Sequence, residues 1–143
     1  MDPLVNRTPV QVRPADLDTL GHVNNAKYLE YLEIGRTAWY EQVGFGSEAK
    51  RRLGLDTVQV NINIDFRQEI RGVEQVLVIT RPVERGRTSF VLGQVICDPN
   101  DESCIYAEAR VTSVVFDPAN RQKHPLPSTF ATCFPERREA GRS

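Results

Sequence analysis

The chain has 143 residues, which is enough for one domain with its own hydrophobic core. Its 18 basic and 19 acidic residues nearly cancel, whereas nucleic-acid and anionic-membrane binding need a surplus of positive charge. No apolar run approaches the roughly 20 residues that cross a bilayer, and the first residues lack the apolar core of a signal peptide. We therefore expect a cytoplasmic protein with neither a nucleic acid nor a membrane as partner.

The first half of the chain predicts a short strand and one long helix. Residues 8–13 alternate weakly and end at Pro14, which is typical of an edge strand. A polar loop follows, and from residue 25 to 43 the apolar residues repeat with a helical period. Gly35 lies inside the apolar stripe, where it costs about 1 kcal/mol relative to Ala, so we expect the helix to approach a sheet closely there. Gly44 supplies the end of the helix.

The second half predicts four strands, at residues 58–66, 74–83, 88–97 and 104–116. The segment 46–57 before them is polar and basic and is interpreted as a loop or a short helix. The first of the four strands alternates from Val58 to Phe66, which predicts one apolar and one polar face. Turn residues at 84–87 and 98–101 predict hairpins, and hairpins imply antiparallel pairing. The expected fold class is α+β, with an antiparallel sheet curled around a long central helix.

Several kinds of site are excluded by what the sequence lacks. The two histidines, His22 and His124, lie about a hundred residues apart, and Cys97, Cys104 and Cys133 show no metal-ligand spacing, so we expect no metal site. There is no Gly-x-Ser-x-Gly elbow, no phosphate loop and no Gly-x-Gly-x-x-Gly fingerprint. The cysteines are interpreted as structural thiols.

The loop before the long helix concentrates the polar groups of the chain. It carries Asp16, Asp18, Gly21, His22 and two asparagines. A turn and a helix cap would explain part of this pattern, with Asn24 as the cap. Carboxylates, an imidazole and the donor-rich start of a helix are also the groups that acyl transfer needs. We therefore interpret this loop as the functional site.

The sequence DLDTLGHVNNAKYL at residues 16–29 resembles the loop typical of hotdog-fold acyl-CoA thioesterases of the 4-hydroxybenzoyl-CoA thioesterase type. Later segments are similar in kind and order, so the resemblance covers roughly residues 8–127. It implies a hotdog thioesterase domain at residues 1–130, followed by a polar C-terminal tail at 131–143. It also implies a homodimer, with a homotetramer as the alternative. The expected reaction hydrolyses an acyl-CoA thioester to the free acid and coenzyme A, which is part of the substrate and not a cofactor.

The resemblance also assigns two catalytic residues. The second aspartate of the Asp-x-Asp pair is the catalytic carboxylate in that family, and here it is Asp18. It would act as a general base on water or as a nucleophile on the thioester carbon. The backbone N–H of Asn25 would stabilise the oxyanion, since the first N–H groups of a helix have no intrahelical partner. Asp16 is expected to brace the loop.

Substrate-binding residues are expected around the loop and at the start of one strand: Gly21, His22, Asn24, Tyr28, Arg87 and Ser89. His22 has two interpretations, a hydrogen-bonding support for the loop or a polar contact to the substrate. Tyr28 lies in the core stripe, so packing is its expected role. Arg87 is a candidate for the coenzyme A phosphates, together with Arg85, Arg121 and Lys123. Ser89 is a candidate for the pantetheine arm or the loop.

Two other functions stay open. A hotdog hydratase or dehydratase would need His22 and Asp18 aimed at the same atom, and the loop lacks the Asp-x-Asn-Pro-x-His spacing associated with those enzymes. The second alternative is a non-catalytic module that binds acyl-CoA or an acyl carrier. The intact Asp18 argues against it.

Overall fold

The computed structural model describes residues 2–135. Its elements in chain order are β1 (Asn6–Gln11), the 3₁₀ turn η1 (Pro14–Asp16), α1 (Asn25–Gln42), α2 (Ser47–Leu53), β2 (Asp56–Phe66), β3 (Gln75–Arg85), β4 (Ser89–Asp98), β5 (Asp101–Asp117), β6 (Gln122–Lys123) and α3 (Ser128–Ala131). None of the helices in this described part is both long and apolar enough to span a bilayer.

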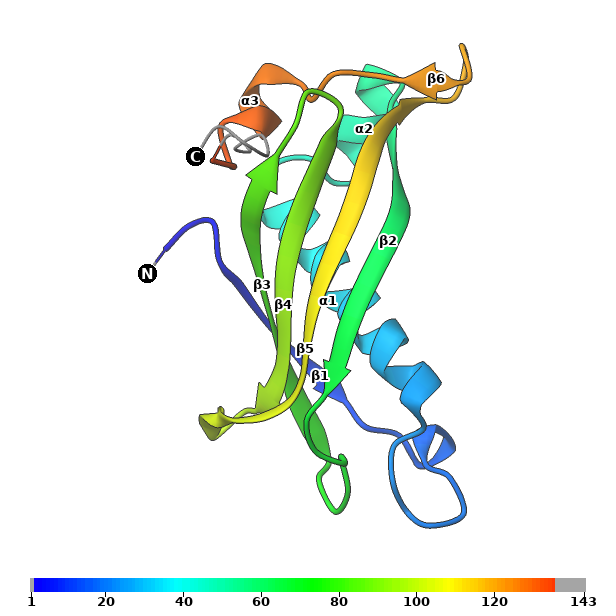
Figure 1. Cartoon of the computed structure of the whole chain (residues 1–143), viewed down its shortest axis with the longest axis vertical. Helices are drawn as coiled ribbons and strands as arrows, with labels where there is room; N and C mark the ends of the chain where they lie inside the picture. Colours follow the sequence, from blue (N-terminus) through cyan, green and yellow to red (C-terminus); the bar gives the residue numbers. More distant parts are fainter. Residues whose placement is uncertain (1, 136–143) are drawn as a thin grey trace, which may run out of the picture.

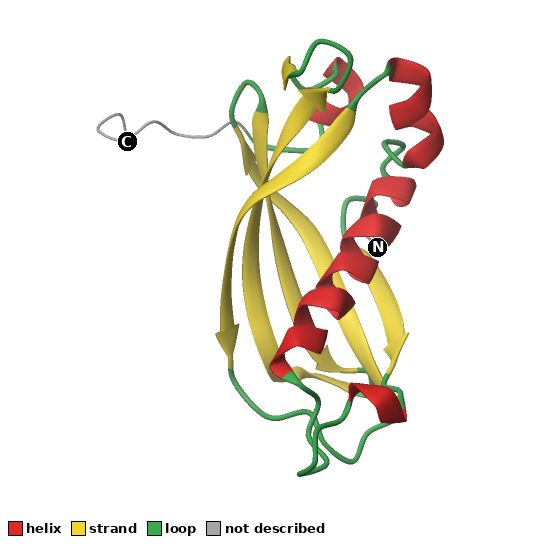
Figure 2. Ribbon diagram, turned by 90° about the vertical axis from the view of Figure 1, so that its right-hand side faces the viewer, coloured by secondary structure: helices red, strands yellow, loops and turns green. Residues whose placement is uncertain are grey.

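The strands form one antiparallel sheet in the order β1-β3-β4-β5-β2, with the short β6 paired to the end of β5. The sheet curls around α1, which lies along its concave side (Figures 1 and 2). This architecture confirms the expected α+β fold and the expected edge strand at the start of the chain. Within the chain, β1 and β2 are the two edges of the sheet.

The helix α1 lies so close to the sheet that one position has no room for a side chain. A Cβ atom added at Gly35 would meet Cγ1 of Val78 on β3 at 2.4 Å and Oγ1 of Thr80 at 3.1 Å. The close approach predicted from Gly35 is therefore confirmed. At its C-terminal end the helix stops at Gly44, whose φ of 84° suits glycine and few other residues.

Aromatic side chains cover the C-terminal half of α1. The ring of Trp39 packs edge-on against Phe130 and Phe134, with centroid distances of 5.9 and 5.7 Å, and its indole N–H donates to the carbonyl of Leu4 at 2.8 Å. Phe134 and Cys133 are buried, so these residues pack with the domain although the polar tail was expected from 131. Residues 136–143 of that expected tail lie outside the described residues.

A β-bulge in β2 changes which residues face the helix. The register of β2 against β5 shifts between Gln59 and Asn61, so that Val60 is an extra residue. Because one extra residue reverses the alternation of side chains, the expected single apolar face from Val58 to Phe66 is wrong. Val58 and Val60 are exposed, whereas Ile62 and Ile64 pack against the core.

Candidate active site

Asp16 anchors the polar loop from inside the core. Its side chain is fully buried, and Oδ2 accepts hydrogen bonds from the Arg13 N–H at 3.0 Å and the Tyr31 hydroxyl at 2.8 Å. Burial alone would raise the pKa of the Asp16 carboxyl, but these hydrogen bonds to the charged form outweigh it and lower the pKa below its usual value. The carbonyl of Asp16 also accepts the Asn24 N–H at 2.9 Å. Asp16 thus holds both ends of the loop, in line with its expected bracing role.

Asp18 lies exposed at the tip of the same loop, and the backbone fixes its carboxylate. Oδ1 accepts the N–H groups of Leu20 at 2.9 Å and of His22 at 3.1 Å, while the Asp18 N–H donates to the carbonyl of His22 at 2.8 Å. The turn between them is made at Gly21, whose φ is 79°. Within residues 2–135 the other carboxylate oxygen, Oδ2, accepts no hydrogen bond, so one oxygen orients the group and the other stays accessible.

The start of α1 leaves one backbone donor for a ligand. Asn24 is the cap: its Oδ1 accepts the Ala26 N–H at 2.9 Å, and its carbonyl accepts the Lys27 N–H at 2.8 Å. In the described part of the chain the N–H of Asn25 has no such acceptor. It carries the positive end of the helix dipole and is suited to an anionic oxygen.

A hollow of about 420 Å³ brings most of the expected site residues together. Its lining contains Asp18, Leu20, His22, Val23, Asn24, Asn25, Tyr28 and Glu69. The carboxylate of Asp18 and the first residue of α1 therefore share one solvent-accessible space. A fixed carboxylate beside a free helix N–H can activate water or attack a carbonyl carbon while the oxygen receives a hydrogen bond.

His22 and Tyr28 are both tied to the segment that precedes β3. Nδ1 of His22 lies 3.3 Å from Oε1 of Glu69, which favours the loop-supporting interpretation of this histidine. Tyr28 is buried and its hydroxyl donates to the carbonyl of Gln68 at 3.2 Å and accepts the N–H of Ile70 at 3.3 Å. Burial raises the pKa of Tyr28, so it is a neutral packing residue at the floor of the hollow.

Arg87 and Ser89 are not brought to this hollow within one protomer. Both lie at or beside the β3–β4 turn, which Figure 1 shows at the opposite end of the molecule from the loop before α1. The carbonyl of Arg87 accepts the Leu126 N–H at 3.0 Å, and its side chain is exposed. The single chain therefore separates these two residues from Asp18 by the length of α1.

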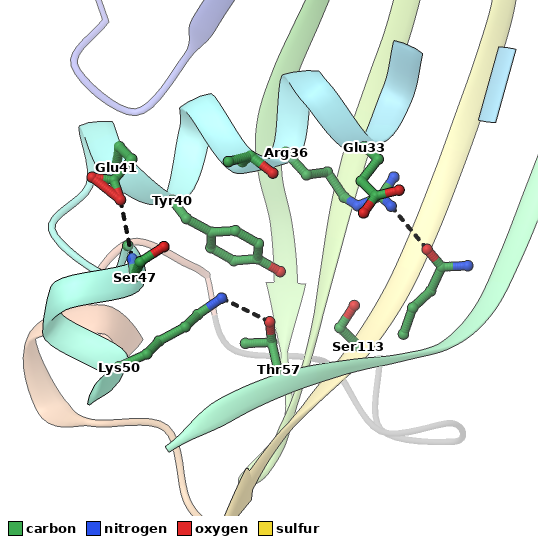
Figure 3. Close-up of a pocket in the computed structure, with 11 residues that line it drawn as sticks. Glu33, Arg36, Tyr40, Glu41, Ser47, Lys50, Thr57 and Ser113 are labelled. Atoms are coloured by element: carbon green, nitrogen blue, oxygen red, sulfur yellow. Dashed lines mark hydrogen bonds between the residues drawn. The ribbon is translucent and has the colours of Figure 1, made fainter. Parts of the chain in front are cut away.

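A second pocket, of about 470 Å³, lies between α1, α2 and the sheet (Figure 3). We call it the Arg36 pocket; its lining includes Glu33, Arg36, Tyr40, Lys50, Thr57 and Ser113. Sequence reasoning missed it, because its residues come from elements far apart in the chain. The cationic run at residues 50–52 is the one local signal for this pocket, and by itself it predicts only a polar loop or short helix. Across residues 2–135 no group of three potential metal-ligating side chains occurs in either pocket or elsewhere.

Comparison with known proteins gives a family match and a common fold. Residues 12–134 match the thioesterase-like superfamily. The long-chain acyl-CoA thioesterase FadM of Escherichia coli (strain K12) is 34% identical over 113 residues, which are 78% of this chain and 83% of FadM.

Two solved structures share the architecture. Slr0204, a 1,4-dihydroxy-2-naphthoyl-CoA thioesterase from Synechocystis, has a TM-score of 0.78 at 21% identity, and the match covers 90% of this chain and 94% of Slr0204. The DHNA-CoA thioesterase from Staphylococcus aureus has a TM-score of 0.77 at 18% identity, with 90% of this chain and 85% of that chain covered. At these identities the likeness concerns the fold alone.

Proposed function

The chain belongs to the thioesterase-like superfamily and is by homology an acyl-CoA thioesterase, and we propose that Asp18 is its catalytic carboxylate. The observation that carries this assignment is the geometry of the loop. Two backbone N–H groups fix one oxygen of Asp18, the other oxygen is accessible, and the first N–H of α1 opens into the same hollow.

In the proposed reaction the thioester carbonyl oxygen receives the N–H of Asn25. Asp18 takes a proton from a water molecule as the water oxygen attacks the carbonyl carbon, and the carbon–sulfur bond breaks to release coenzyme A as a thiolate, which then takes up a proton. Alternatively, Oδ2 itself attacks the carbonyl carbon, the carbon–sulfur bond breaks to release the coenzyme A thiolate, and water hydrolyses the resulting acyl anhydride to the free acid and the Asp18 carboxylate. Loss of one oxyanion donor of this kind typically costs roughly 10²–10³ in rate.

We further infer a homodimer that joins through β2. Within the described chain β2 pairs with β5 on one side, and its other edge is free. The side chains of Val58, Val60 and Phe66 on this strand are exposed. Exposed apolar edges of this kind favour pairing with another strand. A two-fold pairing of β2 with its copy would place the start of one β2 beside the end of the other. Arg87 and Ser89 would then reach coenzyme A bound near Asp18 of the partner subunit.

The test is release of free thiol from a panel of acyl-CoA thioesters by the wild type and by Asp18→Asn. The asparagine keeps an oxygen that accepts the two loop N–H bonds but cannot take the proton, so we expect at least a roughly 10²-fold loss of kcat with unchanged thermal unfolding. Asp18→Ala, which also removes the loop acceptor, is the matched comparison. Equal activity of wild type and Asp18→Asn would overturn the assignment, and rapid-quench mass spectrometry that finds an acylated Asp18 would select the nucleophilic route.

A further inference from the structure

The Arg36 pocket and the hollow at Asp18 lie on one face of α1. Asn25, Leu29, Arg36 and Tyr40 repeat at spacings of three and a half to four residues, which places them in one stripe along the helix. Asn25 and Arg36 are eleven residues apart, or about 16 Å along the helix axis. The stripe thus runs from the proposed oxyanion donor, Asn25, past the guanidinium group of Arg36 to Tyr40.

The strand β2 lies opposite this stripe of α1 and contacts the helix near both of its own ends. Near its end, Phe66 contacts the ring of Tyr28 with a centroid distance of 5.1 Å. Near its start, the Gln59 Oε1 accepts a hydrogen bond from Arg36 at 2.9 Å. Between them, Ile62 and Ile64 are half-buried and Leu29 on α1 is exposed. These residues on α1 and β2 between the two pockets are therefore apolar, whereas each pocket is lined mainly by polar side chains.

The guanidinium of Arg36, at the far end, is held by neutral groups. Arg36 donates to Oε1 of Gln94 at 3.0 Å and to Gln59, and Gln94 is itself fixed by the carbonyl of Leu32 and the hydroxyl of Thr80, each at 2.9 Å. No carboxylate in the described chain lies within ion-pair distance of Arg36. A partly buried guanidinium that has no carboxylate in direct contact is suited to bind one.

Lys50 on α2 points into the same space (Figure 3). Its ammonium donates to Oγ1 of Thr57 at 2.9 Å and lies 3.9 Å from the centre of the Tyr40 ring, while its one carboxylate contact, Oδ1 of Asp56, is at 3.9 Å. Burial lowers the pKa of both Arg36 and Lys50, which reflects cations that are removed from water without full compensation.

Two carboxylates also line the pocket, and both act on these cations from beyond ion-pair distance: the charge of Glu33 raises the pKa of Arg36, and the charge of Glu41 raises that of Lys50. Oε1 of Glu41 accepts the N–H of Ser47 at 3.0 Å at the start of α2. Glu33 is exposed to solvent, and its carboxylate forms no ion pair with the described cations. Arg36 and Lys50 are therefore the more buried charges of this pocket, and Glu33 and Glu41 are the exposed ones.

We propose that the Arg36 pocket recognises a carboxylate at the far end of the acyl chain, so that the preferred substrates are ω-carboxyacyl-CoA thioesters. The inference rests on the proposed function, because it takes the thioester end to be bound at Asp18 and Asn25. The apolar stretch at Leu29, Ile62 and Ile64 receives the methylene chain. A plain alkyl end would instead bury against Arg36 and Lys50 and remove water from both cations without supplying a new counter-charge.

The test compares adipoyl-, suberoyl- and sebacoyl-CoA with hexanoyl-, octanoyl- and decanoyl-CoA, which match them in chain length. We expect kcat/KM of the wild type to favour the carboxylated member of at least one pair by tenfold or more. In Arg36→Gln and Lys50→Gln this ratio should fall toward one, mainly through a higher KM for the carboxylated substrate. Arg52→Gln removes the same charge from the exposed part of α2 and should keep the wild-type ratio.

Each outcome decides the inference separately from the proposed function. If thiol is released but the wild type favours the alkyl member of every pair or shows no preference, the inference is wrong and the thioesterase assignment stands. If no substrate is hydrolysed, binding of free suberate by isothermal titration is decisive. Saturable binding that Lys50→Gln weakens at least tenfold and Arg52→Gln leaves unchanged supports the pocket, and absence of binding overturns it. Lys50→Gln also replaces Arg36→Gln if the latter does not fold.

Discussion

The hydroxyl of Tyr31 donates to Oδ2 of Asp16 across 2.8 Å, and both side chains are buried beneath the loop that presents Asp18. This pair joins the middle of α1 to the start of the loop. The position of Asp18 therefore depends on a contact that is shielded from solvent.

Tyr31→Phe is expected to destabilise the protein and to lower its activity together. The buried Asp16 carboxylate loses a donor, which typically costs about 1–3 kcal/mol, and the loop loses an anchor. Urea unfolding and thiol release measure the two effects. Tyr106→Phe is the control, because its hydroxyl lies 3.4 Å from Asp98 and contributes a weaker bond.

The same pair predicts how stability changes in acid. Hydrogen bonds hold the pKa of Asp16 below its usual value in the folded state, so this carboxylate stabilises the protein above the pKa of the unfolded chain. That contribution is lost as the pH falls through the folded-state pKa. Tyr31→Phe removes one of these hydrogen bonds, so the pKa of Asp16 is lowered less in the variant. The free energy of unfolding of the variant should therefore fall less steeply than that of the wild type below about pH 4.

Gly35→Ala is expected to destabilise the protein although alanine favours helices. The gain in helix propensity is about 1 kcal/mol, but the new Cβ would lie 2.4 Å from Cγ1 of Val78. Overpacking of this kind typically costs about 1–3 kcal/mol. Thermal unfolding should show a lower Tm for Gly35→Ala and a recovery in Gly35→Ala with Val78→Ala, whereas Thr37→Ala, at an exposed position of α1, should be nearly neutral.

Val60→Asp is expected to separate the proposed dimer. The residue is 55% exposed at the bulge of the free edge strand, and a charge placed there would be buried between two copies of β2. Light scattering after gel filtration should give the mass of two chains for the wild type and of one for the variant. Leu53→Asp changes an exposed apolar residue on α2 in the same way and should leave the dimer intact. A monomeric wild type would contradict the inferred assembly.

The three cysteines are expected to differ in reactivity. Burial raises the pKa of Cys97 to about 11 and also raises that of Cys133, whereas Cys104 is only partly buried. Since the thiolate is the reactive form, a thiol reagent at neutral pH should modify Cys104 in the native protein and all three residues after unfolding. Mass spectrometry of the labelled peptides gives the order in which the three cysteines react. Rapid labelling of Cys97 in the native state would contradict the packing of β4.

Local features were predictable from the sequence, and features that depend on distant contacts were not. The cap at Asn24, the helix from Asn25 and the close approach at Gly35 follow from short-range patterns and were confirmed. The bulge at Val60 was missed because a strict alternation of residue types gives no sign of one extra residue.

The same difference between local patterns and distant contacts applies to the site. Asp18 and Asn25 share a hollow because they belong to one loop and the helix that follows it. Arg36 and Lys50 could not be paired from the sequence, since only the packing of α2 against β2 and α1 brings them to one pocket. Arg87 was expected to meet the coenzyme A phosphates, but it lies in the turn between β3 and β4, and the length of α1 separates that turn from Asp18 within one protomer.

The position of Trp39 lets its fluorescence report when the segments around Leu4 and Phe134 have packed against α1. It is the only tryptophan of the chain, and it contacts Leu4 near the beginning and Phe130 and Phe134 near the end. A nascent chain that lacks the last of these residues leaves the indole in contact with water. A shift of the Trp39 fluorescence toward shorter wavelength therefore marks the step at which the segments that contain Leu4 and Phe134 pack against α1.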